Sequence, residues 1–291
     1  MEQESKPVVS QELTSCNCCN SEDVVPILKA PDFEMAPVQI FHCKNCAALC
    51  PDYPEVVEDE ISRQTSFHEE FWKDETPESL AELVAGMEAV VDFYEGIIKA
   101  PGENTIAYDI GSGRGNLLAA LLAKGYDAYG CEPSAELSHR ARAAFDLPGD
   151  RLITTSALDF LAQRSEEQGR VNIIFLWHVI EHFENPMEIL REAVKSLAPD
   201  GVLICQGPML SPGYVYPAHR FFHSESNIAW IARELGLKVI FLDGFTKERF
   251  ISFALAKEEH PKPGIDTVFL TSPEDAVGSL YYTLSKALAN N

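Results

Sequence analysis

Basic side chains are scarce in this chain of 291 residues, which has 23 Lys and Arg against 45 Asp and Glu and a formal net charge of −22. Nucleic-acid-binding proteins draw much of their affinity from clustered Lys and Arg, and anionic membranes attract polybasic segments. The charge balance therefore argues against a phosphate backbone or an anionic membrane surface as the main partner.

Long apolar runs are also missing. No stretch approaches the roughly 18 consecutive apolar residues that indicate a transmembrane helix. The first residues, Met-Glu-Gln-Glu-Ser-Lys, have neither the basic nor the apolar region of a signal peptide. We therefore expect a cytoplasmic protein without a membrane span, in which cysteine thiols stay reduced.

Cysteine, in contrast, is concentrated near the N-terminus, where six of the eight cysteines fall between residues 16 and 50. Cys16 and Cys19 form one CxxC pair, and Cys43 and Cys46 form a second. Two such pairs are typical of a tetrahedral four-cysteine zinc site. Because a module of about 50 residues has little core of its own, the metal would supply folding energy.

Other residues leave the ligand set open. Cys18 or Cys50 could replace a neighbouring cysteine, and His42 is a weaker candidate. The alternative is a group of reduced thiols without metal. We interpret residues 1–52 as a small module with a structural zinc ribbon.

The next segment, residues 53–104, carries much of the negative charge: residues 52–103 hold 15 acidic and three basic side chains. Between Pro77 and Lys99 apolar residues recur at helical spacing, which predicts an amphipathic helix with an acidic, solvated face. The segment is interpreted as an acidic helical lid or linker. An aromatic cluster precedes the helix and consists of Phe67, His68, Phe71 and Trp72. It could fold over the cofactor as a lid, or it could simply pack the helix onto the sheet.

From residue 105 onward, short apolar runs alternate with amphipathic stretches. This alternation is typical of an α/β fold with an open, mostly parallel sheet. Strands are expected at 105–110, 127–131, 151–155, 171–177, 202–206, 238–242 and 250–256. Helices are expected at 116–124, 135–145, 157–164, 185–197 and 224–235, with Asn185 as the N-cap of its helix.

A glycine-rich loop, Asp109-Ile110-Gly111-Ser112-Gly113-Arg114-Gly115, follows the first of these strands and opens the first helix. Such a loop lets a nucleotide-type cofactor approach the backbone at a helix N-terminus. Its GxGxG spacing, with Asp109 two residues before it, favours an amino-acid moiety, whose ammonium group the carboxylate could pair. Glu132 at the end of the second strand could accept ribose hydroxyls. These features favour S-adenosylmethionine (SAM) over NAD.

At these motifs the sequence resembles the class I SAM-dependent methyltransferases. Further matching segments are Cys131-Glu132-Pro133-Ser134, Trp177-His178-Val179-Ile180-Glu181-His182, Leu197-Ala198-Pro199-Asp200-Gly201-Val202-Leu203 and His219-Arg220-Phe221-Phe222-His223-Ser224. The resemblance covers residues 105–257. Residues 41–49 are similar to the zinc-binding N-termini of a subset of bacterial methyltransferases, many of which act on sugars, polyketides or other small metabolites.

The resemblance implies a Rossmann-like, seven-stranded sheet with helices on both faces and an antiparallel last strand. It also implies the residues that bind the cofactor. The methionine part would lie at Asp109, Gly111, Gly113 and Gly115, the ribose at Glu132 and Pro133, and the adenine at Ser156 and Ala157, while Trp177 and His178 would form a wall of the pocket. Many members of the family carry Asp where this chain has Ser156.

A hydroxyl or carbon-acid acceptor must lose a proton during methyl transfer, usually to a histidine or a carboxylate. The preferred bases are His182 and His219, with Glu181 orienting a histidine or capping the next helix. Each of them could instead be a structural, hydrogen-bonded residue. Two further possibilities concern the same region. Tyr214 and Tyr216 are candidates to shape the acceptor pocket, and a divalent metal could bind to His178, Glu181 and His182 together with His219 or His223.

We therefore interpret the chain as a class I methyltransferase, residues 105–257, preceded by a zinc ribbon and followed by a C-terminal extension, residues 258–291. The expected partner is a small-molecule methyl acceptor, such as a sugar or secondary-metabolite intermediate, methylated on oxygen or carbon. The alternatives are an RNA methyltransferase that uses the ribbon and a non-catalytic SAM-binding scaffold. An NAD-dependent dehydrogenase is the least favoured.

Overall fold

The computed structural model describes residues 13–32, 35–53, 75–243 and 249–265. Two expectations fall wholly or mostly outside this range. They are the aromatic cluster of Phe67, His68, Phe71 and Trp72, and most of the C-terminal extension at 258–291.

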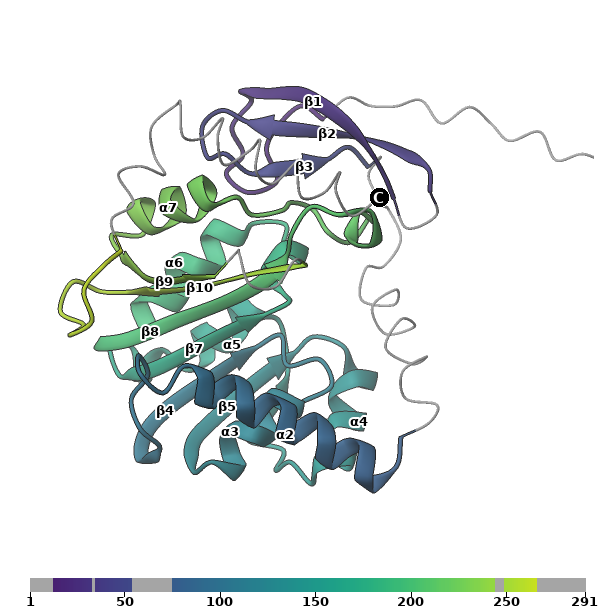
Figure 1. Ribbon diagram of the computed structural model, residues 1–291. Coiled ribbons are helices and arrows are strands. Elements are labelled where there is room, and N and C mark those ends of the chain that lie inside the picture. Colours follow the sequence, from purple (N-terminus) through teal and green to yellow (C-terminus); the bar gives the residue numbers. More distant parts are fainter. Residues whose placement is uncertain (1–12, 33–34, 54–74, 244–248, 266–291) are drawn as a thin grey trace, which may run out of the picture.

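Two sheets make up the structure (Figure 1). A small antiparallel sheet has the order β1-β2-β3, and its strands are β1 (Val24–Pro31), β2 (Pro37–Cys43) and β3 (Leu49–Pro51). The large sheet has the order β6-β5-β4-β7-β8-β10-β9. Its strands are β4 (Gly102–Ile110), β5 (Tyr126–Glu132), β6 (Leu152–Thr154), β7 (Val171–Trp177), β8 (Leu197–Pro208), β9 (Lys238–Asp243) and β10 (Phe250–Ala256).

The large sheet is parallel except for β10, which pairs antiparallel with both β8 and β9. The expected Rossmann-like, seven-stranded sheet with an antiparallel last strand is therefore confirmed. Because the strand order reverses beside β4, the carboxyl ends of β4 and β7 flank the point where open α/β sheets bind ligands.

Among the described residues, three helices pack on each face of the large sheet. One face carries α2 (Pro77–Phe93), α3 (Asn116–Ala123) and α4 (Ala135–Phe145), and the other carries α5 (Ala157–Gln163), α6 (Pro186–Ser196) and α7 (Glu225–Glu234). Short 3₁₀ turns follow α5, β7 and β8, at Ser165–Glu167, Ile180–His182 and Pro212–Tyr214. In the part of the chain that is described, no helix combines the length and apolarity needed to cross a membrane.

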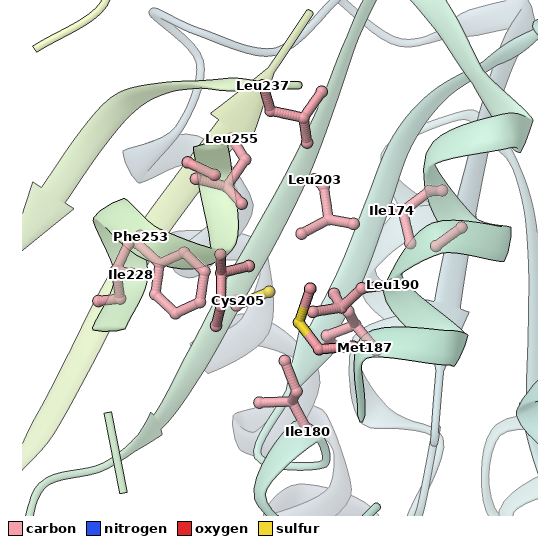
Figure 2. Packing of buried hydrophobic residues seen from close by; sticks show 14 of the residues in the cluster. Ile174, Ile180, Met187, Leu190, Leu203, Cys205, Ile228, Leu237, Phe253 and Leu255 are labelled. Atoms are coloured by element: carbon pink, nitrogen blue, oxygen red, sulfur yellow. The ribbon is translucent and has the colours of Figure 1, made fainter. Parts of the chain in front are cut away.

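Alternation along the central strands builds a core on both faces, since successive side chains of a strand point to opposite sides. On β7, Ile174 packs toward the α5–α7 face, whereas Ile173 and Phe175 pack toward α2 and α3. Figure 2 shows the first of these cores, where Ile174 and Leu203 from the sheet meet Leu190 of α6. All three are buried, so the sheet is a rigid base for the loops at its carboxyl edge.

Several boundaries differ from those expected. The helix expected over residues 77–99 ends at Phe93, and its last turn is followed by hydrogen-bonded turns in which Ile97 and Ile98 are still buried. Strand β8 extends beyond the expected 202–206 at both ends because it pairs with β7 on one side and β10 on the other. Asn185 precedes α6 as expected, but its side chain makes no capping hydrogen bond.

The small sheet is joined directly to the loop that follows β8. Leu49 and Phe222 form an antiparallel bridge with N–O distances of 3.1 and 2.7 Å. The Ser224 hydroxyl donates to the Ala47 carbonyl at 2.8 Å. In Figure 1 the small sheet lies over α7 and this loop, which we call the bridging loop, residues 217–224. The cysteine-rich module thus contacts the acceptor side of the fold expected from the sequence.

Candidate functional site

The glycine-rich loop connects β4 to α3, as expected, and its three glycines have φ values of 74°, 49° and 77°. At Gly111 a Cβ atom would overlap the Val179 side chain, and at Gly115 it would lie 2.9 Å from the Ala141 Cβ of α4. At Gly113 it would meet none of the described residues within 4 Å. Gly111 and Gly115 are therefore required by packing within the protein, whereas Gly113 leaves the backbone open to a ligand.

This difference predicts a large effect for Gly111→Ala. The substitution combines a left-handed backbone, which costs an L-residue about 1–2 kcal/mol, with a steric overlap that typically costs about 1–3 kcal/mol more. We expect a drop in the free energy of unfolding of about 2–5 kcal/mol, measured by urea denaturation. Gly125→Ala is the matched control, because Gly125 has φ 88° but open space around it. Equal losses in the two variants would contradict the packing role of Gly111.

A cavity of about 450 Å³ opens beside this loop. Its polar groups include Asp109, Ser112 and Gln206, and its apolar walls include Trp177 and Phe250. The remaining lining residues are Met87, Val90, Gly111, Asn116, Leu117 and His178. We call this space the cofactor cavity. It joins the carboxyl ends of β4, β7 and β8 to the N-terminus of α3, where Gly115 provides no side-chain cap for the first backbone amides.

Asp109 is the charged group of the cavity. Its side chain is buried, and within the described residues its Oδ2 atom has no hydrogen-bond partner. Burial, together with the nearby Glu132 carboxylate, raises the pKa of Asp109 to about 7. A buried carboxylate without a partner is costly, so the site would gain from a cationic ligand group placed against Oδ2. The ammonium group of an amino-acid moiety meets this need.

Glu132 lies beside the loop but does not line the cavity. Its two carboxylate oxygens accept hydrogen bonds from the backbone amides of Gly113, at 3.0 Å, and Ser134, at 2.9 Å. Burial raises the pKa of this carboxyl, although the two amides oppose the shift. The Glu132 side chain thus holds the glycine-rich loop through the Gly113 amide. Each carboxylate oxygen retains a second lone pair for a ligand hydroxyl.

Three residues expected to bind the ribose or the adenine are not brought to the cavity. Pro133 and Ser156 are exposed, and Ala157 is half-buried. The Ser156 hydroxyl caps α5: it accepts from the Asp159 amide at 3.1 Å and donates to the Asp159 carboxylate at 2.8 Å. The role of these three residues in binding the cofactor stays a prediction.

A second group of polar side chains gathers at the 3₁₀ turn after β7. Glu181 and His182 in this turn meet His219 of the bridging loop, and one ligating atom from each lies within 4.8 Å of the others. Glu181 is buried, with 1% of its side chain exposed. His182 Nδ1 lies 3.0 Å from the Ala218 carbonyl, and His219 Nδ1 lies 2.7 Å from the Tyr214 carbonyl. These bonds make Nδ1 the donor in each ring, which leaves Nε2 as the basic nitrogen.

Electrostatics within this histidine–glutamate cluster are unusual. Burial alone would raise the pKa of Glu181, but the proximity of His178, His182 and His219 outweighs it and lowers the pKa to about 2. Burial lowers the pKa of His219 to about 4. At neutral pH the cluster therefore contains an ionised carboxylate and a neutral His219 imidazole. Such groups can accept a proton or ligate a metal ion.

His178 connects the cluster to the cofactor cavity, because it lines the cavity and its Nδ1 lies 3.8 Å from Glu181 Oε1. Its other ring nitrogen, Nε2, lies 2.9 Å from Gln206 Oε1, and Gln206 in turn donates to the Ser252 hydroxyl at 2.5 Å. The backbone of His178 has φ 55°, a strained value for a residue other than glycine. Sequence reasoning missed Gln206, although a lone amide directly after the apolar run at residues 202–205 was a usable signal.

The aromatic residues expected at the acceptor side surround His219. The Tyr216 ring lies 4.1 Å from the His219 ring, and the Tyr214 ring stacks at 6.3 Å with an interplanar angle of 20°. Tyr214 also packs edge-on against Phe250 of the cofactor cavity. His223 is placed deeper: its Nδ1 lies 2.7 Å from Asn227 Oδ1, and it is buried. Tyr214 and Tyr216 therefore lie beside His219, whereas His223 is hydrogen-bonded to Asn227 of α7.

The four cysteines of the two CxxC pairs lie together, with sulfur–sulfur distances of 3.5 Å between Cys16 and Cys46 and 3.6 Å between Cys19 and Cys43. The two pairs have the same backbone geometry. Asn20 and Ala47, which follow the second cysteine of each pair, both have φ 58°, and each amide donates to the carbonyl of the first cysteine at 2.8 Å. This repeated turn favours the CxxC cysteines over Cys18 and Cys50 as a ligand set.

The competing cysteines have other surroundings. Cys18 Sγ accepts from the Asn227 side-chain amide of α7 at 3.6 Å. Cys50 Sγ lies 3.8 Å from Cys16 Sγ but outside the four-sulfur group. Backbone amides also point at the cluster, from Cys18 to Cys16 Sγ at 3.3 Å and from Cys46 to Cys43 Sγ at 3.5 Å. Such amide contacts favour thiolates, which are the form that ligates a metal.

Comparison with known proteins places these features in a family. Residues 100–242 match the family model of a methyltransferase domain. A SAM-dependent methyltransferase from Archaeoglobus fulgidus is 14% identical, with a TM-score of 0.47 over 60% of this chain and 94% of that one. A structure from Haloferax volcanii, a complex of the Trm112 methyltransferase activator with a putative methyltransferase, is 15% identical, with a TM-score of 0.46 over 69% and 98%.

A third similar structure is the geranyl diphosphate C-methyltransferase from Streptomyces coelicolor, which is 14% identical, with a TM-score of 0.46 over 58% of this chain and 77% of that one. No curated protein sequence matches the chain. The segment that matches the family model contains the glycine-rich loop, Asp109, and the sheet from β4 almost to the end of β9. This match identifies residues 100–242 as a methyltransferase domain, in agreement with the SAM-dependent methyltransferase of the class I fold that the sequence predicts.

Proposed function

We propose that this methyltransferase modifies a small molecule, with oxygen or carbon as the favoured acceptor atom. One observation carries the proposal: His178 links the cofactor cavity to a buried cluster of proton-accepting side chains. A methyl donor in the cavity would then lie next to groups that can take a proton from an acceptor. A biosynthetic intermediate such as a sugar or secondary metabolite is the kind of acceptor we expect.

The residues in and beside the cavity fit SAM. Oδ2 of Asp109 provides a place for the ammonium group, and the uncapped N-terminus of α3 provides backbone amides for a carboxylate. The open side of Gly113 lets the ligand approach the loop, and the carboxylate of Glu132 can accept ribose hydroxyls. When bound, SAM supplies an electrophilic methyl group on a sulfonium ion.

The protein would contribute alignment, exclusion of water and proton removal. Trp177 and Phe250 provide apolar walls that exclude water from the cavity. His182 and His219 are the proposed acceptors of the substrate proton, because the hydrogen bonds at Nδ1 leave Nε2 as the proton-accepting nitrogen of each ring. Glu181 would stabilise the imidazolium that forms. As the methyl carbon bonds to the acceptor, the electron pair of the carbon–sulfur bond stays with sulfur.

We further propose that Cys16, Cys19, Cys43 and Cys46 hold a structural zinc ion. Four thiolates around a closed, buried position leave no site for substrate. The ribbon would act on catalysis only through the bridging loop, which it contacts at Ala47 and Leu49.

Transfer of an isotopically labelled methyl group tests the proposed function. The chain is incubated with methyl-labelled SAM and, separately, with a panel of hydroxylated small molecules and with RNA. We expect label in small molecules, with release of S-adenosylhomocysteine. Label in RNA alone would replace the proposal with an RNA methyltransferase. Bound SAM with no transfer to any acceptor would favour a non-catalytic scaffold.

The raised pKa of Asp109 predicts that SAM binding depends on pH. An ammonium group favours the ionised carboxylate, so binding below about pH 7 must release a proton from Asp109. We expect the affinity to fall by up to about tenfold per pH unit as the pH drops below 7. Isothermal titration calorimetry at pH 6, in two buffers of different ionisation enthalpy, measures the released proton directly.

Asp109→Asn is the matched variant for this prediction. It should bind SAM more weakly at pH 8, without the proton release. Because the folded-state pKa lies above the ordinary value of 3.8, the ionised Asp109 destabilises the ligand-free chain progressively as the pH rises from about 4 to 7. The variant should therefore be more stable than the parent at pH 8. A variant that still releases the proton would show that another group is responsible.

A further inference from the structure

The histidine–glutamate cluster has a feature that proton transfer alone does not explain. Within the described residues, neither carboxylate oxygen of Glu181 has a hydrogen-bond partner, although the side chain is only 1% exposed. Burying an ionised carboxylate without hydrogen bonds is strongly unfavourable. A compensating positive charge is therefore expected at this position.

The neighbouring imidazoles do not supply that charge by direct contact. The His178 Nδ1–Glu181 Oε1 distance is 3.8 Å, and the His219 Nε2–Glu181 Oε1 distance is 3.9 Å. Both are too long for a hydrogen bond. They suit an intervening ion, because a cation about 2.1 Å from each ligand can bridge atoms up to about 4.2 Å apart.

The remaining nitrogen of each ring is already occupied in the way that metal-ligating histidines require. Such a histidine almost always donates its other N–H to a carbonyl or carboxylate, which fixes the ring and its tautomer. His182 and His219 donate to the carbonyls of Ala218 and Tyr214. His178 donates from Nε2 to the Gln206 side-chain oxygen.

We propose that Glu181, His182 and His219 bind a divalent transition-metal ion, with His178 Nδ1 at the edge of the site that faces the cofactor cavity. Two imidazoles and one carboxylate form a ligand set that suits Mn²⁺, Fe²⁺, Co²⁺ or Zn²⁺ and leaves positions open for a substrate. The site is separate from the four-cysteine cluster.

The site would define the acceptor class, and this part rests on the proposed function. An acceptor hydroxyl that coordinates the ion loses its proton to solvent at a lower pH than in water. Its oxygen then bonds to the methyl carbon, the carbon–sulfur bond breaks, and sulfur keeps the electron pair. With the ion bound, the acceptor is an oxygen nucleophile. His182 and His219 then ligate the metal, and solvent takes the substrate proton that the two imidazoles would accept in a metal-free site.

Binding of Mn²⁺ to the full zinc-loaded chain tests the site without reference to activity, because Mn²⁺ has little affinity for thiolates. The loss of the free-ion signal in electron paramagnetic resonance reports bound Mn²⁺, and elemental analysis reports zinc. We expect the parent chain to bind one Mn²⁺. If a copurified metal already fills the site, we instead expect elemental analysis to show one tightly bound metal ion in addition to the zinc of the ribbon. Absence of both would overturn the proposal.

Glu181→Gln and His219→Asn should each weaken Mn²⁺ binding at least tenfold, with the zinc content unchanged. His139→Gln is the control, because His139 is an exposed histidine of α4. Thermal melts establish that the variants are folded, and Glu181→Gln removes a buried charge without changing volume. Unchanged Mn²⁺ binding in both variants would contradict the site. Methyl transfer that survives complete removal of this metal would overturn the metal's role and leave the proposed function intact.

Discussion

Replacement of Cys43 by serine is expected to release the zinc ion and unfold the N-terminal ribbon. Cys43 is fully buried and ends β2, and its carbonyl and amide both bond to the turn that presents Cys46. Structural zinc contributes roughly 10–16 kcal/mol of binding energy in small zinc modules. Besides the zinc site, the ribbon has only a small apolar cluster, in which Ile40 and Leu49 pack with Phe222. Elemental analysis should show loss of zinc, and hydrogen exchange should show rapid exchange of the β2 amides.

The consequence should extend to the bridging loop. This loop is held between the ribbon and the 3₁₀ turn, since Phe222 bridges Leu49 while the Arg220 amide donates to the Glu181 carbonyl at 2.9 Å. His219 immediately precedes the first of these two attachments in the chain. Misplacing a catalytic side chain by about 1 Å can cost on the order of 100-fold in rate, so we expect a loss of methyl transfer of that size. The parallel sheet should remain folded, because its core is built by α2–α7.

Cys50→Ala is the matched control. Cys50 is also fully buried and lies 3.8 Å from Cys16 Sγ, yet it stands outside the four-sulfur group. We expect it to keep zinc and lose only about 1 kcal/mol of stability through the small cavity left behind. Loss of zinc in Cys50→Ala, with zinc retained in Cys43→Ser, would assign the ligands differently. If the amides of residues 217–224 exchange at an unchanged rate in zinc-free Cys43→Ser, the ribbon does not position the bridging loop.

The cysteine module illustrates what spacing can and cannot predict. The two CxxC pairs predicted a four-sulfur cluster, which the structure contains. The spacing left Cys18 and Cys50 as competitors, because ligand choice depends on backbone turns that have no fixed sequence signature. Asn20 adopts the left-handed conformation readily, but Ala47 does so only because its amide is held by the Cys43 carbonyl. The bridge to Phe222, far away in the sequence, had no local signal.

The α/β domain was predictable where one physical constraint dominates. Strand β7 has the expected limits because it is buried on both faces, which requires a continuous apolar run. Boundaries were wrong where tertiary contacts override local patterns. The apolar spacing of α2 continues through Ile97 and Ile98, yet these side chains reach the core from a turn. The two ends of β8 contain polar and small residues. These residues are extended only because they pair with β7 and β10.

The site was predictable in composition and less so in geometry. The GxGxG loop and Asp109 lie where the motif predicted, because a strand–loop–helix unit fixes its own geometry. Ser156, in contrast, is engaged as a helix cap rather than at the cofactor cavity, and capping competes for serine hydroxyls wherever a helix begins. The convergence of Glu181 with His219 depends on the path of the bridging loop, which no periodic pattern encodes.

His219→Asn is expected to abolish most methyl transfer while leaving SAM binding nearly unchanged. The side chain lies in the histidine–glutamate cluster, 3.9 Å from Glu181, and is not part of the cofactor cavity. Loss of a proton-accepting or metal-ligating imidazole typically costs about 10²–10⁴-fold in rate. We therefore expect kcat to fall by that factor and the Kd for SAM to stay within about threefold. Steady-state kinetics and calorimetry with SAM measure the two quantities separately.

The two readouts also distinguish a chemical role from a structural one. Because His219 donates to the Tyr214 carbonyl at 2.7 Å, its loss could loosen the bridging loop as well as remove the imidazole. Asparagine is chosen because its amide can still donate to that carbonyl. If the variant keeps the melting temperature of the parent and loses activity, the imidazole itself is required. If activity stays within about threefold of the parent, His219 is a structural residue and the acceptor proton leaves by another route.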